Sequence, residues 1–95
     1  MSTRTVIAGE SIPALPRHVR LKHDETRGAW VMLAPERVLM PDEIAVEILR
    51  RCDGKATVDA ICASLAAEFD APEQEIREDV VAVLQDLADK GFLIA

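Results

Sequence analysis

The chain lacks the features on which most catalytic and membrane functions depend. Its 95 residues contain no apolar run near the ~20 residues that span a bilayer, and its N-terminus has no apolar signal-peptide core. No glycine-rich phosphate loop is present. Ser64 falls within a predicted helix, without the glycines of a nucleophile elbow. We expect a small cytoplasmic domain that is neither an enzyme nor inserted in a membrane.

Metal ligands are also scarce. Cys52 and Cys62 are the two cysteines and form no CxxC motif; without export signals, both are expected to be reduced. His18 and His23 are predicted on one strand at an odd spacing, so their side chains should project to opposite faces. The sequence therefore predicts no metal site and no bound cofactor.

Negative charge is concentrated at the C-terminal end. The net charge is −6, and the part from Glu68 onward has eight acidic residues against Arg77 and Lys90, which leaves the rest about neutral. Such a surface disfavours phosphates, and the predicted helix over residues 58–69 has no Lys or Arg to read a DNA groove. Nucleic acid is not expected as a partner.

Three short strands are predicted in the first half. Apolar and charged residues alternate from Arg17, and Gly28 can adopt the positive φ of the turn that follows. Residues 29–34 are apolar and favour a second strand, which Pro35-Glu36 ends. A third strand is predicted over residues 37–40. Because no later strand follows, its outer edge is expected to be uncovered.

A first helix is predicted to begin at Pro41, which suits the first helical turn because its missing N–H costs nothing there. Ile44, Ile48 and Leu49 are expected to face the core. Asp53-Gly54 is a stop signal for the helix.

Two further helices are predicted beyond this stop. Thr57 is the expected N-cap of the second, with Phe69 packed at its end. The third runs from about Pro72 to Asp89, and Gly91 terminates it. Its apolar stripe has helical spacing and consists of Ile76, Val80, Val83, Leu84 and Leu87.

The predicted fold class is α+β: a three-stranded antiparallel sheet followed by a three-helix bundle, the content of a winged helix-turn-helix domain. Residues 1–12 show no useful periodicity and are predicted to be a flexible tail. The domain is expected to cover residues 13–95.

Two stretches of the sequence carry a family resemblance. The run HDETRGAWVMLAPERVLMPDEIAVEILRRCDGKATVDAIC and the later DLADKGFL resemble the PqqD family of pyrroloquinoline quinone (PQQ) biosynthesis. That family is the stand-alone form of the RiPP recognition element, a winged-helix-like module. The resemblance implies a peptide chaperone that binds the PqqA precursor peptide and presents it to the radical-SAM enzyme PqqE. The iron–sulfur cluster and S-adenosylmethionine would then belong to the enzyme.

The resemblance also implies where the peptide binds. The leader part of the precursor would add as a strand beside the third strand and pack against the third helix. The residues that this places at the peptide-binding site are Arg37, Val38, Leu39, Met40, Ile76, Val80, Val83, Leu84 and Leu87.

Several alternatives stay open at this point. Val80 and Leu84 are expected equally to line the groove or to pack in the core, since so small a domain needs most of its apolar stripe for packing. A winged-helix DNA-binding protein and a self-associating structural module are the competing functions. The free protein is expected to be a monomer or a weak homodimer, because exposed edge strands pair with copies of themselves.

Overall fold

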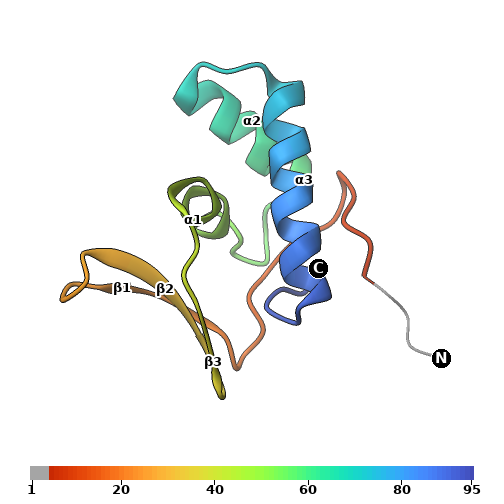
Figure 1. The fold of residues 1–95 in the computed structure, drawn as a ribbon. Coiled ribbons are helices and arrows are strands. Elements are labelled where there is room, and N and C mark those ends of the chain that lie inside the picture. Colours follow the sequence, from red (N-terminus) through yellow and green to blue (C-terminus); the bar gives the residue numbers. More distant parts are fainter. Residues whose placement is uncertain (1–4) are drawn as a thin grey trace.

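The computed structural model describes residues 5–95, and in them three strands precede three helices, as predicted (Figure 1). The strands are β1 (Arg20–Asp24), β2 (Ala29–Ala34) and β3 (Arg37–Leu39). The helices are α1 (Glu43–Leu49), α2 (Val58–Phe69) and α3 (Glu73–Asp89). None of these helices is long and apolar enough to cross a bilayer.

The sheet is an antiparallel meander in the order β1-β2-β3. Gly28 in the first turn has φ +65°, as the turn prediction requires. The second turn holds only Pro35 and Glu36, and Glu36 has φ 63°. Proline at the first central position and a positive φ at the second are the features of a type II turn. Glu36 thus takes a conformation that glycine adopts at lower cost.

Side-chain caps fix where two helices begin. The Asp42 carboxylate accepts a hydrogen bond from the N–H of Ala45 at 2.8 Å, so α1 starts one residue later than its cap and Pro41 lies outside the helix. The third strand likewise ends at Leu39 rather than Met40. The Thr57 hydroxyl caps α2 by accepting from Ala60 at 3.1 Å, as predicted.

The core lies between the sheet and the three helices. Met32 from β2, Ile48 from α1, Ile61 from α2 and Leu84 from α3 are all fully buried within it. Two residues expected to pack inside do not: Ile44 is 60% exposed and Phe69 52% exposed. Because α1 has apolar residues at five of its seven positions, one buried face cannot hold them all.

The N-terminal segment packs against the helices instead of standing apart as a tail. Ile7 is buried in the core, and its N–H donates to the Gln85 side chain at 2.9 Å. The carbonyls of Gly9 and Ser11 accept from the first N–H groups of α2. Figure 1 shows this segment (red) passing α2 and α3. Residues 1–4 of the predicted tail lie outside the described part of the chain, and residues 5–12 belong with the domain.

Candidate functional site

The outer edge of β3 pairs with no other strand among the described residues, because β3 is last in the sheet order. Ala34 and Arg37 close a two-residue turn, so they form a hydrogen-bonded pair. Residue pairs along an antiparallel ladder alternate between hydrogen-bonded and non-hydrogen-bonded. The next pair, Leu33 and Val38, is therefore a non-hydrogen-bonded pair. The N–H and C=O of Val38 therefore face outward and are available to an added strand.

The β3 side chains divide between the two faces of the sheet. Val38 is 63% exposed and shares the outer face with its partner Leu33. Leu39 points to the inner face and packs against the core. Met40, just beyond the strand, is also exposed, and its sulfur accepts from Arg27 at 3.5 Å. Val38 and Met40 are thus accessible to a partner, whereas Leu39 is a packing residue.

Arg37 is already engaged within the protein. Its guanidinium donates to the carbonyl of Lys90 at 2.7 Å and lies 4.3 Å from the centre of the Phe92 ring. Lys90 is the C-cap of α3, so this side chain joins the start of β3 to the end of α3. Contact with a peptide through the same guanidinium would require giving up this link.

The predicted peptide-binding stripe of α3 is largely inside the protein. Val80 and Leu84 are fully buried and Leu87 is 5% exposed, so these three residues form core contacts. We expected all three at the binding site, and Val80 and Leu84 equally in the core; in the free protein all three are core residues, because so small a domain uses most of its apolar stripe for packing. Ile76 and Val83 are half-buried and keep part of their surface accessible.

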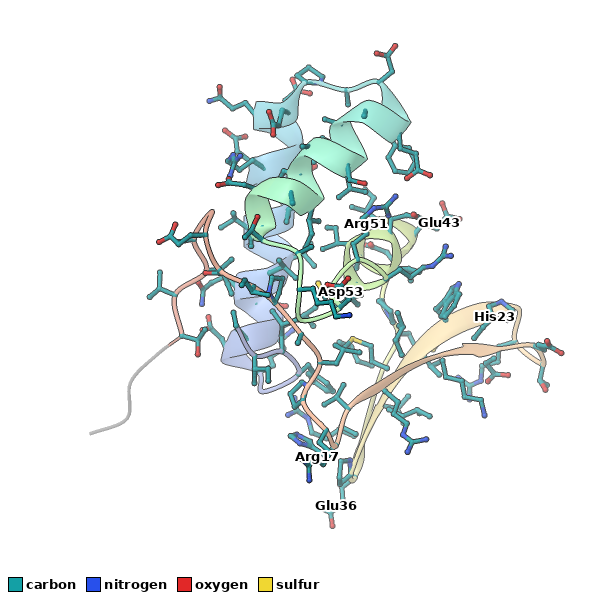
Figure 2. All side chains as sticks on the ribbon, turned by 180° about the vertical axis from the view of Figure 1, so that it is seen from behind. Arg17, His23, Glu36, Glu43, Arg51 and Asp53 are labelled. Atoms are coloured by element: carbon teal, nitrogen blue, oxygen red, sulfur yellow. The ribbon has the colours of Figure 1, made fainter. Side chains whose placement is uncertain are left out.

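An open groove of about 610 Å³ lies at the end of the sheet where β3 leads into α1. It is bordered by the β1–β2 hairpin, by α1, by the end of α2 and by the first turns of α3. The exposed Ile44 and Phe69 and the half-buried Ile76 give it apolar walls, and the buried Val80 lies at its base. Figure 2 labels two of its lining residues, His23 on the β1–β2 hairpin and Glu43 on α1.

Sequence reasoning missed most of this groove. The sequence predicts that Ile44 faces the core and that Phe69 packs at the end of α2, whereas both are exposed and line the groove. The available signal was the excess of apolar residues in α1 over what one helix face can bury.

Charged and aromatic side chains are layered beside the groove. Arg51 forms ion pairs with Glu47 at 3.0 Å and with Glu68. Arg50 reaches Glu47 at 3.7 Å and lies 5.6 Å from the Trp30 ring centre. Trp30 in turn meets His23 edge-on, with ring centres 5.2 Å apart. Trp30 is half-buried and lines the groove, and it is not among the residues of the core cluster.

The groove's lining contains no cysteine. Cys52 and Cys62 are both buried with free thiols, and burial raises the pKa of the Cys52 thiol to about 12, so it stays protonated at neutral pH. Among residues 5–95, no three His, Cys, Asp or Glu side chains are grouped to hold a metal ion. What the site offers is an open strand edge and an apolar groove.

Residues 29–93 match the sequence model of the family described as "Coenzyme PQQ synthesis protein D (PqqD)". The chain belongs to the PqqD family. It is 63% identical over 94 residues to a "PqqA binding protein" of Rhodopseudomonas palustris (strain TIE-1), covering 98% of this chain and 92% of that protein. A homologue of the same name in Rhizobium meliloti (strain 1021) is 47% identical, covering 93% of this chain and 90% of that protein.

Solved structures agree with this assignment. The solution structure of the PqqD truncation of Methylobacterium extorquens PqqCD, described as a functional and stand-alone RiPP recognition element, is 40% identical to this chain. The match has a TM-score of 0.81 and covers 94% of this chain and 95% of that one. The family assignment also confirms that this protein is not an enzyme.

A more distant match extends the fold beyond the family. A lasso peptide synthetase B1, solved in complex with its leader peptide, has a TM-score of 0.75 at 15% identity. The match covers 90% of this chain and all of the other. At this identity the likeness concerns the arrangement of three strands and three helices alone.

Proposed function

We propose that this protein is a peptide chaperone of PQQ biosynthesis that binds the PqqA precursor peptide. Homologues up to 63% identical over nearly the whole chain are named for PqqA binding, and its 40%-identical structural neighbour is described as a recognition element. The peptide adds as a strand to the open edge of β3, and the complex presents it to the radical-SAM enzyme PqqE. The observation that carries the binding mode is the outward-facing main chain of Val38 at an unpaired sheet edge.

The hydrogen bonds of the β3 edge cannot by themselves supply the free energy of peptide binding. Val38 offers one donor and one acceptor, and each net hydrogen bond contributes only ~0.5–1.5 kcal/mol. A micromolar complex needs about −8 kcal/mol, and ordering a disordered leader costs a further ~2–5 kcal/mol. Burial of apolar side chains, at roughly 1.5–3 kcal/mol each, has to supply the difference.

The groove is placed to receive such side chains. Pro41 lines it and follows the β3 edge by two residues, so a peptide extended along β3 continues toward Ile44 and Ile76. Strand addition characteristically combines main-chain hydrogen bonds with pockets for alternate side chains. The edge and the groove together form the peptide-binding site that we propose.

Hydrogen exchange of individual amides tests the binding mode directly. In the free protein the N–H of Val38 faces solvent, whereas that of Leu39 belongs to the β2–β3 ladder. Saturating PqqA peptide should slow exchange at Val38 at least ~10-fold and change Leu39 little, with NMR shifts at Ile44 and Ile76. Binding without protection at Val38 would replace strand addition with another mode. No binding at all would overturn the proposed function.

Self-association at the same edge is a second candidate, favoured by the exposed Val38 and Met40. It predicts protection of Val38 without peptide, rising with protein concentration. If added peptide reduces the measured mass while Val38 stays protected, the edge serves both roles. Presentation to PqqE predicts that labelled protein and peptide co-migrate with the enzyme as a ternary complex.

A further inference from the structure

The apolar groove carries a charge pattern that the peptide-binding role does not by itself require. Glu43 and Glu47 line it from α1, one helical turn apart, and Asp79 lines it from α3. Ile44 and Ile76, from the same two helices, lie among these carboxylates. An apolar surface is thus bordered by acidic groups from two separate helices.

The three carboxylates differ in whether the protein balances their charge. Glu47 forms ion pairs with Arg50 at 3.7 Å and Arg51 at 3.0 Å. Glu43 and Asp79 form no ion pair within residues 5–95. Two negative charges therefore remain uncompensated at the groove, one on each side.

We propose that the groove selects a segment in which an apolar side chain is flanked by Lys or Arg. The inference rests on the proposed function and names the class of peptide sequence that the same site accepts. The apolar residue packs between Ile44 and Ile76, and the basic residues pair with Glu43 and Asp79. Lys and Arg suit this arrangement because their aliphatic stems cover apolar surface while the charged end reaches a carboxylate.

The charges act mainly as a filter on which peptide register is held. An exposed ion pair contributes little affinity, but an acidic residue in the same place would be repelled from both sides. Because the β3 edge reads only the main chain, it cannot distinguish one register from the next. The groove charges supply the selection that the edge lacks.

Neutralising substitutions in the full-length protein test this. Glu43→Gln with Asp79→Asn removes both uncompensated charges and keeps the side-chain shapes. The control is Glu75→Gln with Glu78→Gln, which makes the same change in net charge at two exposed α3 residues outside the groove. Fluorescence anisotropy with labelled PqqA peptide gives the affinity of each variant at low and high salt.

We expect the groove pair to weaken binding about two- to twentyfold at low salt, with less effect at high salt because mobile ions screen exposed charges. The control pair should change affinity less than about twofold. Equal losses in both pairs, or tighter binding by the groove pair, would overturn the proposal. In those cases peptide binding itself would persist, so the chaperone function would stand.

A charge exchange identifies the peptide residue involved. Each Lys or Arg of the PqqA peptide is replaced by Glu in turn, and each peptide is tested against Glu43→Lys protein. One of these peptides should bind the original protein more weakly, and its affinity should rise at least about threefold with the Glu43→Lys protein. A double-mutant cycle measures this coupling. A peptide whose bound segment contains no Lys or Arg would overturn the proposal. If the original protein does not bind the unmodified PqqA peptide at all, both this proposal and the proposed function are overturned.

Discussion

The sequence predicts that both the edge of β3 and the apolar face of α3 contact the peptide, but in the structure the first is exposed and the second is mostly buried. β3 leaves Val38 63% exposed with its main chain facing outward. α3 buries Val80, Leu84 and Leu87 in the core. A strand edge is free because its hydrogen-bonding groups lie in the plane of the sheet, outside the packed faces. A helix stripe in a small domain has no such spare surface.

The largest expected effect concerns the α3 side of this comparison. Leu84→Ala should lower the free energy of unfolding by ~2–5 kcal/mol, since it removes a fully buried side chain and leaves a cavity. Val83→Ala, at a half-buried position on the same helix, should cost clearly less. Urea denaturation measures both. If Leu84→Ala kept its stability but lost peptide affinity, Leu84 would line the binding site after all.

A change of intermediate size is expected at the β3 edge. Val38→Pro removes the outward N–H without breaking a bond of the β2–β3 ladder, so it should weaken PqqA binding about tenfold while the domain stays folded. Val38→Ala keeps that N–H and should bind within about threefold of the original. Anisotropy gives the affinities, and circular dichroism reports folding. Equal affinity of the proline and alanine variants would exclude this main chain from the interface.

The smallest effect is expected in the turn that sets the edge in place. Glu36 has φ 63°, a conformation that costs a non-glycine residue ~1 kcal/mol or more. Glycine relieves this cost but is more flexible in the unfolded chain. Glu36→Gly should therefore stabilise the fold by about 0.5 kcal/mol and leave peptide affinity unchanged. A destabilised variant would mean that the Glu36 side chain makes a contact worth more than the backbone cost.

Local signals in the sequence were sufficient for most of the fold. Gly28, Thr57 and Gly91 mark their turns and caps correctly because each acts through its own backbone conformation or a neighbour's N–H. The edge position of β3 followed from the element order. These predictions depend on contacts within a few residues.

The candidate site was less predictable because it depends on competition for the core. Helical periodicity identifies Ile44, Phe69 and Leu84 as apolar face residues but does not rank their access to a limited interior. Ile7 takes a place in that interior from a segment without periodicity. The groove exists because Ile44 and Phe69 are left outside, a result that only the packed chain defines.

The N-terminal segment has a consequence for the order in which the chain folds. Ile7 contacts Gln85, and Ala14 exchanges two backbone hydrogen bonds with Ile94, so its partners lie near the opposite end of the chain. Closing such long loops has a high entropic cost until the intervening elements are formed. We expect this segment to dock last during folding and to detach first under mild denaturant, uncovering the start of α2 while the sheet and its open edge remain intact.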